Sequence, residues 1–268
     1  MKIEKKIGLI GVGNMGAAIL EGLISKKIAS PDQVWIYDKI LDKPLEFASK
    51  WKVHVARSNS EVVQQTEVIV FAVKPQDLLA TAAEIKSHLR PSQIFISILA
   101  GTPIQKLKNA FDSKPRFIRA MPNLGAKVGE SLTALTGEAS ALKIADDIFS
   151  ACGITIHLQD EKYFDLITAL SGSGPAYFFY LMELMAKEAV SHGLDAKQAR
   201  TLAIQTALGA ALLAKSADEH PEELRKKVTS KGGTTEAALN VFADKKFHEI
   251  FSEAIEAALR RGQELSRG

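Results

Sequence analysis

The sequence predicts an α/β protein in which a doubly wound parallel sheet is followed by an all-helical domain. Short β-branched runs alternate with helical stretches through about residue 160, as in parallel sheets that carry helices on both faces. A glycine-rich turn directly follows the first of these runs. Beyond Tyr163 the chain is rich in Ala, Leu, Glu and Lys and shows no period-two run, which is typical of helices. We therefore expect two domains, residues 1–161 and 162–268.

Eight apolar runs are expected to be strands, because they are short, β-branched and bounded by turn residues. They are Lys6–Ile10, Gln33–Tyr37, Val53–Ala56, Val68–Val73, Ile94–Ile98, Phe117–Ala120, Ser131–Leu135 and Ile154–Leu158. Helices are expected at Ala17–Ser25, Leu45–Trp51, Leu78–Leu89 and Ala139–Ala151. The last two strands would extend one edge of the sheet.

The first predicted strand leads into a Gly-x-Gly-x-x-Gly turn and then a helix, with the residues Gly11, Val12, Gly13, Asn14, Met15 and Gly16. The first glycine permits a tight turn, the second lets the backbone approach a pyrophosphate, and the third lets helix and strand pack closely. Asp38 ends the second predicted strand, 22 positions after Gly16, near the spacing of an acid that binds the adenosine ribose. The pattern predicts a dinucleotide site in a Rossmann-type domain. A glycine-rich turn without a ligand is the alternative.

Three further strand ends carry similar turns: Ala72-Val73-Lys74-Pro75, Ala100-Gly101 and Arg119–Asn123. In open α/β sheets, ligands lie outside the carboxyl ends of the strands. Ordinary connections would account for the glycine and the proline, but not for three such strand ends beside a nucleotide motif. We therefore expect all three to face the cofactor.

The helical part contains two turns rich in glycine and hydroxyl groups, each followed by a helix. One is Ser171–Pro175, which leads into a predicted helix Ala176–His192, and the other is Ser230–Thr235. A helix N-terminus binds small anions through its free N–H groups. A simple N-cap at Ser173 would explain the first turn equally well, whereas a plain helix connection does not need the second.

Composition excludes several other classes. Lys and Arg number 34 against 31 Asp and Glu, without a basic patch, so nucleic acid is not expected as a partner. Cys152 is the single cysteine, which rules out an internal disulfide and is typical of a buried thiol in a reducing compartment. No apolar run is long enough to span a membrane, and no histidine has metal-ligand spacing. We expect a cytoplasmic protein without a metal site.

The predicted helix Ala199–Ala214 consists mostly of alanine and leucine and is apolar almost all round. Such a helix has to be buried on every side. A helical domain of this size would bury it poorly alone, so we expect it to pack against a second subunit, which makes this a dimerisation domain. A self-contained helical bundle is the alternative.

Together these segments resemble the Δ1-pyrroline-5-carboxylate reductase family, and the resemblance runs almost end to end. It rests on Gly11–Gly16, Ala72–Pro75, Ser97–Gly101, Arg119–Asn123, Ser171–Tyr177, His220-Pro221 and above all Val228–Thr235. The resemblance implies NAD(P)H-dependent reduction of the cyclic imine 1-pyrroline-5-carboxylate to L-proline, the last step of proline biosynthesis. It also implies a homo-oligomer built from dimers, often assembled into rings such as decamers.

The resemblance also implies roles for individual residues. Thr235 and Ser171 would be catalytic, and Ser173, Ser230, Gly232, Gly233 and Thr234 would bind the substrate. The cofactor would contact Gly11, Gly13, Asn14, Met15, Gly16, Asp38, Ala72, Val73, Lys74, Pro75, Ala100, Gly101 and Asn123.

Three features of the sequence bear on these roles. Lys231 stands where the family usually has proline, and Leu124-Gly125 stands where Thr-Pro is common. Asp38 favours NADH, yet Lys39 and Lys43 are near enough in sequence to offset its repulsion of a 2′-phosphate.

Two other functions remain open on sequence alone. One is a related two-domain reductase, either a β-hydroxyacid dehydrogenase or a general imine reductase. A β-hydroxyacid dehydrogenase would carry a catalytic lysine in the first helix of its second domain. The predicted helix Ala176–His192 offers only Lys187, roughly three turns from the loop that should face the cofactor. The other is a non-catalytic, dimeric dinucleotide sensor.

Overall fold

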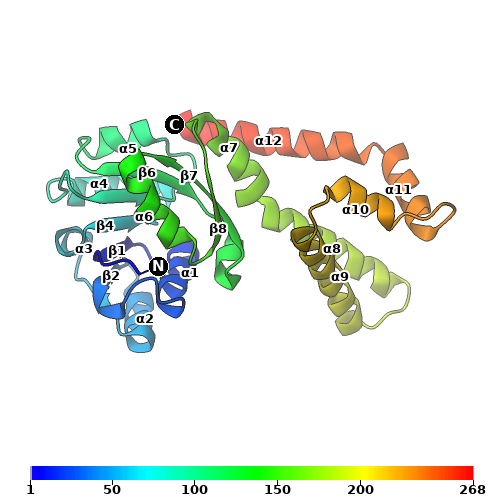
Figure 1. Cartoon of the computed structure of the whole chain (residues 1–268), viewed down its shortest axis with the longest axis horizontal. Coiled ribbons are helices and arrows are strands. Elements are labelled where there is room, and N and C mark those ends of the chain that lie inside the picture. The colour runs from blue at the N-terminus through cyan, green and yellow to red at the C-terminus, as the bar shows by residue number, and fades with distance from the viewer. Residues whose placement is uncertain (1, 268) are drawn as a thin grey trace. The chain divides into compact units, whose positions relative to one another are not determined.

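The computed structural model describes residues 2–267 of the chain. The chain divides into two compact units (Figure 1). The first runs to Ser173 and also includes the C-terminal segment from Leu259, and the second is Gly174–Ala258. The domain boundary expected between residues 161 and 162 stays a prediction.

The first unit contains an eight-stranded sheet in the order β3-β2-β1-β4-β5-β6-β7-β8. All neighbouring strands are parallel except β6 and β7, which are antiparallel. The strands are β1 Ile7–Ile10, β2 Val34–Tyr37, β3 His54–Val55, β4 Val68–Phe71, β5 Ile94–Ser97, β6 Arg116–Met121, β7 Ser131–Gly137 and β8 Gly153–His157. This confirms the predicted Rossmann-type sheet. The change of winding direction between β1 and β4 creates the crevice where such sheets bind ligands.

Helices cover both faces of this sheet. They are α1 Asn14–Ser25, α2 Asp42–Trp51, α3 Asn59–Gln65, α4 Leu78–Ile85, α5 Ile104–Ala110, α6 Ala139–Phe149 and α7 Phe164–Ile167. Short turns are η1 Pro31–Gln33, η2 Pro75–Asp77, η3 Leu124–Val128, η4 Glu161–Tyr163 and the π-helix η5 Thr168–Gly172. Figure 1 shows α1 and α6 along one face of the sheet and α3, α4 and α5 along the other.

The strands are apolar on both sides because successive side chains enter different cores. Leu9 packs with α1 and α6, whereas its neighbour Ile10 packs with α3, α4 and α5. On the second face, Phe71, Phe95 and Phe111 form a buried aromatic cluster with ring centroids 4.6–5.7 Å apart. These two cores hold the carboxyl ends of the strands, and the loops that follow them, in a fixed arrangement.

Cys152 is buried, and its Sγ lies 3.7 Å from the carbonyl oxygen of Ala18. Burial raises the pKa of this thiol to about 11, against an ordinary value of 9.0. At pH 8 its thiolate is therefore roughly 100-fold scarcer than that of an ordinary thiol. We expect the native protein not to react with a disulfide reagent such as DTNB at pH 8, and to react with one equivalent in denaturant. Fast labelling of the native protein would show that Cys152 is accessible.

The second unit is helical. It contains α8 Gly174–Ser191, α9 Ala196–Ser216, α10 Pro221–Lys227, α11 Thr234–Asp244 and the first part of α12 Phe247–Arg267. α8 packs along α9, yet only Ala199 and Ala203 of α9 are buried. Large apolar side chains on both helices are exposed: Phe178, Phe179, Tyr180, Leu181, Leu184, Met185, Val190, Leu202, Ile204, Leu208, Leu212 and Leu213. The self-contained bundle is therefore not what the chain forms.

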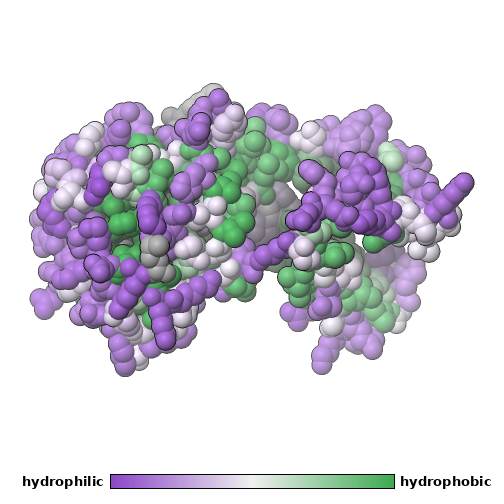
Figure 2. Space-filling model, viewed as in Figure 1, coloured by the Kyte–Doolittle hydropathy of each residue, from purple (hydrophilic) through white to green (hydrophobic). Residues whose placement is uncertain are grey.

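The exposed apolar side chains of α8 and α9 form one surface, which we call the α8/α9 face. Figure 2 shows hydrophobic residues gathered over these two helices. No helix between residues 2 and 267 has the length and apolar character that a membrane span requires.

Candidate active site

The glycine-rich loop between β1 and α1 has two glycines that the fold requires and one that it does not. Gly11 has φ +95°, and a Cβ there would lie 2.7 Å from the carbonyl oxygen of Ala72. A Cβ on Gly16 would lie 2.1 Å from the carbonyl oxygen of Gly11. A Cβ on Gly13 would meet nothing within 4 Å. Gly13 therefore leaves open space at the point where a pyrophosphate would approach the backbone.

The N-terminus of α1 is also suited to a phosphate. Gly13 is its N-cap and no side chain caps the helix, so its first N–H groups have no partner within the helix. Met15 is half-buried and packs against the core beneath the loop, while Asn14 is exposed. Lys127 reaches this exposed residue, its Nζ donating to Oδ1 of Asn14 at 3.2 Å. These features fit a dinucleotide, and the sequence reasoning missed Lys127 because it lies 113 positions along the chain.

Asp38 fastens the glycine loop to the end of β2. Its Oδ2 accepts from the Val12 N–H at 2.8 Å and its Oδ1 accepts from the Ile40 N–H at 3.0 Å. Each carboxylate oxygen keeps a second lone pair that a ribose hydroxyl can use. Lys39, the residue expected to offset the Asp38 charge, is paired with Asp77 of η2 at 3.1 Å.

The predicted cofactor loops lie at the carboxyl ends of the central strands. Ala72 donates its N–H to Ile10 at 2.8 Å, which places the β4 loop beside the glycine loop. Val73 and Lys74 continue this loop and Pro75 begins η2. Gly101, next to Ala100 after β5, has φ +60°, and a Cβ there would lie 2.8 Å from Cβ of Leu265 near the end of α12. The structure therefore brings the C-terminal segment of the chain against this loop.

Asn123 and Ser171, far apart in sequence, are brought into contact. Nδ2 of Asn123 donates to Oγ of Ser171 at 3.0 Å, and its Oδ1 accepts from the Gly125 N–H at 3.0 Å. The Asn123 N–H in turn donates to Oγ of Ser131 at 3.0 Å. Ser171 lies in the π-helix η5, which is closed by the Ser173 N–H donating to Thr168 at 2.9 Å. π-Helical turns of this kind are frequent at functional sites.

The shape of the Leu124-Gly125 loop is fixed by close backbone contact. The two residues begin the short helix η3, and a Cβ on Gly125 would lie 2.5 Å from the carbonyl oxygen of Glu130. Only glycine fits there without a shift of the backbone. This position accordingly serves to hold Asn123 in place.

The Ser230–Thr235 loop of the second unit leads into the N-terminus of α11. Gly232 has φ +72°, and its N–H donates to Oε2 of Glu236 at 2.7 Å. The Gly233 N–H donates to the carbonyl of Ser230 at 3.0 Å. No side chain caps α11, so the N–H groups of Thr234 and Thr235 have no acceptor within the helix.

Glu236 is a functional candidate that the sequence reasoning missed. It lies three residues after the N-cap Gly233, the position of the acid in a capping box, and accepts the N–H of Gly232, one residue before that N-cap. Its carboxylate holds the left-handed turn at Gly232 and adds negative charge at the helix N-terminus. Lys231, next to that turn, is exposed.

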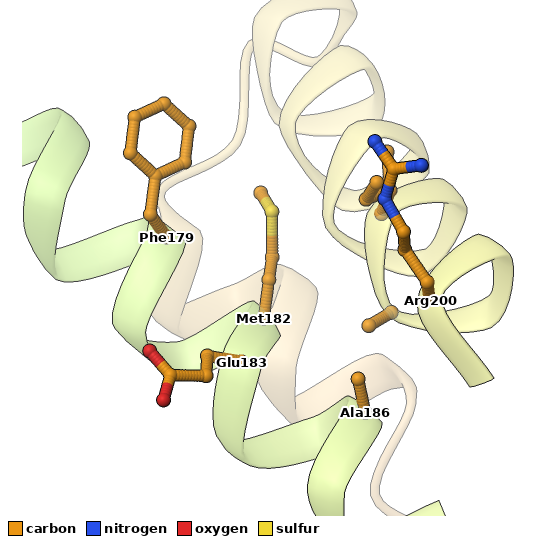
Figure 3. Close-up of a pocket in the computed structure, with 7 residues that line it drawn as sticks. Phe179, Met182, Glu183, Ala186 and Arg200 are labelled. Atoms are coloured by element: carbon orange, nitrogen blue, oxygen red, sulfur yellow. The ribbon is translucent and has the colours of Figure 1, made fainter. Parts of the chain in front are cut away.

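A cavity of about 230 Å³ lies between α8 and α9, within the α8/α9 face. Figure 3 shows Phe179 and Met182 of α8 extending into the space between the helices, with Arg200 on α9 beside it. Ala186, Ala203 and Ile204 complete most of its lining. An open apolar groove of this kind suits insertion of side chains from another chain.

Comparison with known proteins identifies the family. The pattern of the family described as pyrroline-5-carboxylate reductase dimerisation matches residues 161–265, and that of NADP oxidoreductase, coenzyme F420-dependent, matches residues 6–101. A pyrroline-5-carboxylate reductase of Pseudomonas aeruginosa is 38% identical, covering 97% of this chain and 97% of its own. The chain belongs to the pyrroline-5-carboxylate reductase family.

Two solved pyrroline-5-carboxylate reductase structures resemble the whole chain. That of Coxiella burnetii is 34% identical with a TM-score of 0.91, covering 98% of this chain and 99% of its own. The Plasmodium falciparum pyrroline carboxylate reductase, solved with NADP bound, is 28% identical with a TM-score of 0.88, covering 99% and 100%. Membership in this family decides against the β-hydroxyacid dehydrogenase that the sequence had left open.

Proposed function

We propose that this chain reduces 1-pyrroline-5-carboxylate to L-proline with NAD(P)H. The observation that carries the proposal is the Ser230–Thr235 loop, which places uncapped N–H groups and a threonine hydroxyl at one helix N-terminus. A ring acid with a carboxylate and a C=N bond matches that set of donors. Family membership and the open space at Gly13 support the dinucleotide as its reductant.

The residues of the first unit would bind the cofactor. The pyrophosphate would lie at the N–H groups of Gly13–Gly16 and the ribose at Asp38. Ala72–Pro75, Ala100-Gly101 and Asn123 would border the nicotinamide, which supplies a hydride when bound in reduced form. Asn123 also holds Ser171, so the hydroxyl expected to act in the reaction is oriented before substrate binds.

The residues of the second unit would bind the substrate. The uncapped N–H groups of Thr234 and Thr235, with the Ser230 hydroxyl, would hold the carboxylate, as helix N-termini hold small anions. Gly232 and Gly233, whose own N–H groups donate to Glu236 and to the Ser230 carbonyl, would shape the turn around it. Ser173, the last residue of the first unit before its C-terminal segment, would also contact the substrate. The reduction adds a hydride to the imine carbon, and the ring nitrogen ends as an amine. A protonated imine needs no strong acid, and the Thr235 hydroxyl would orient and stabilise its N–H.

The direct test follows oxidation of NADPH and of NADH when 1-pyrroline-5-carboxylate is added. We expect turnover by the wild type, and a Thr235→Val variant whose kcat/KM is lower by roughly 100- to 1000-fold, the usual effect of removing one oriented donor. Thr229→Val is the matched control, because the Thr229 hydroxyl donates to Arg225 at 2.7 Å and is already used within the helix end. A wild type that binds dinucleotide but oxidises neither cofactor would instead be the sensor that the sequence left open.

We further propose that the enzyme is a homo-oligomer whose building block is a dimer formed through the α8/α9 face. The exposed leucines and aromatic residues of that face support it, together with the match to a dimerisation family. A larger ring such as a decamer, and a cytoplasmic location, are the further expectations from the resemblance.

A further inference from the structure

Arg119 is a buried charge that the proposed chemistry does not use. It lies on β6, between β5 and β7, and is 2% exposed. Its Nη1 donates to Oε1 of Glu161 at 3.0 Å, and its guanidinium carbon lies 4.6 Å from the ring centroid of Phe164. Among the described residues, its Nη2 has no hydrogen-bond partner, the carboxylate of Asp165 being 3.9 Å away.

Stability alone does not account for this arrangement. A buried ion pair loses hydration energy, and an apolar side chain of similar size is often as stable or more so. Here one guanidinium nitrogen is also left without an acceptor, which adds a further cost to the free energy of folding. What the guanidinium provides is geometry, because it is planar and can pair with a carboxylate and stack on an aromatic ring at once.

The groups that Arg119 contacts lie at the start of the segment 161–172, which carries Ser171 near its end. Glu161 lies in η4, Phe164 and Asp165 begin α7, and the π-helix η5 follows α7 without a break. The two carboxylates are each held by a second element. Glu161 accepts the Ile104 N–H of α5 at 2.8 Å, and Asp165 accepts the Ser266 hydroxyl of α12 at 2.9 Å.

The far end of the same segment is held by the strand that carries Arg119. Asn123, two residues beyond the end of β6, donates to Ser171 at 3.0 Å. A Cβ on Gly172 would lie 2.8 Å from Cε of Met121, the last residue of β6. The segment 161–172 is thus attached to β6 at both ends, through Arg119 at its start and through Met121 and Asn123 at its end.

We propose that Arg119 is a positioning residue that sets the place of Ser171. By fixing Glu161, Phe164 and Asp165 against β6, it determines where the π-helix presents the serine hydroxyl to the reaction. Its contribution to the reaction rests on the proposed function, while its effect on the segment 161–172 does not.

The test combines kinetics with hydrogen–deuterium exchange in the full-length protein. Arg119→Lys keeps the charge but loses the fork and the stacking, and Glu161→Gln keeps an acceptor for Ile104 but loses the ion pair. We expect each to lower kcat roughly 10- to 100-fold, the cost of misplacing a reacting group by about 1 Å. The Kd for NADH, measured by fluorescence, should stay unchanged because the glycine loop is not altered. Amide exchange should rise in the peptide covering residues 164–172 and not in that covering residues 8–25.

Two comparisons separate positioning from a general loss of structure. Arg116→Lys is the matched control. Arg116 is the first residue of the same strand, and its guanidinium donates to the carbonyl of Ser92 at 2.9 Å, away from the segment 161–172. This variant should leave kcat unchanged. In a Ser171→Ala background, Arg119→Lys should cause little further loss of kcat, since a residue that acts through Ser171 has no effect without it.

Losses that multiply in the double variant would overturn the proposal, as would unchanged exchange in residues 164–172. A wild type inactive on 1-pyrroline-5-carboxylate, with raised exchange in Arg119→Lys, would refute the proposed function while supporting the positioning of Ser171. An active wild type with unaltered kcat in both variants would refute the positioning alone.

Discussion

Replacing Gly13 with alanine is expected to abolish tight dinucleotide binding and leave folding intact. A Cβ at this position meets no atom of the protein within 4 Å, so the native fold has room for it. The same methyl group would project where the pyrophosphate has to approach the N–H groups of α1. We expect the Kd for NADH or NADPH to rise by about 100-fold or more, with a melting temperature within a few degrees of the wild type. Fluorescence titration and calorimetry measure the two quantities.

Gly16→Ala is the matched comparison, because it adds the same methyl group to the same motif. Its Cβ would lie 2.1 Å from the carbonyl oxygen of Gly11, so α1 and β1 would have to separate. This variant should lose stability by several kcal/mol, as overpacked sites do. Unchanged cofactor affinity in Gly13→Ala would mean that the pyrophosphate does not bind at this loop.

Introducing charge on the α8/α9 face is expected to dissociate the oligomer. Leu208 and Leu212 of α9 are 46% and 54% exposed in the single chain. A symmetric interface buries both residues of each protomer, and because each leucine is already about half covered, its further burial contributes roughly half of the 1.5–3 kcal/mol of a fully exposed one. Leu208→Glu with Leu212→Glu should therefore weaken dimerisation by at least roughly two orders of magnitude. Sedimentation velocity would show this as a shift from oligomer to monomer.

Leu79→Glu is the control for the α8/α9 face. Leu79 lies on α4 and is 71% exposed, so it is equally apolar but belongs to the first unit. Its substitution should leave the sedimentation coefficient unchanged. An oligomer that survives both α9 substitutions would place the subunit interface elsewhere.

Much of the first unit could be predicted from local patterns. Its strands are short apolar runs between turn residues, and each predicted strand has a counterpart in the sheet. The observed strand ends differ from the predicted ones by one or two residues. For example, β4 ends at Phe71, whereas the predicted strand ended at Val73. The helix predicted at Leu78–Leu89 ends at Ile85, consistent with Pro91 disfavouring helix just before it. The antiparallel pairing of β6 with β7 was not predicted, because periodicity does not report strand direction.

The candidate site was predictable in part. The glycine motif and Asp38 were found because a strand, a turn and a helix leave a signal within about 30 residues. The contacts of Asn123 with Ser171, of Arg119 with Glu161, and of Lys127 with Asn14 join residues 42 to 113 positions apart. No local pattern reports such contacts, since they depend on how the elements pack.

The amino-acid order alone determined the alternation of strands and helices, the turn that accepts a dinucleotide, and the apolar character of α9, because each depends on neighbouring residues and their spacing. Tertiary structure decided which side chains meet. It assigned Asp38 to the backbone of the glycine loop, placed Ser171 against Asn123, and left the leucines of α9 about half exposed. These outcomes follow from packing between distant segments, where a close approach of a few ångströms is set by the whole core rather than by any one stretch of sequence.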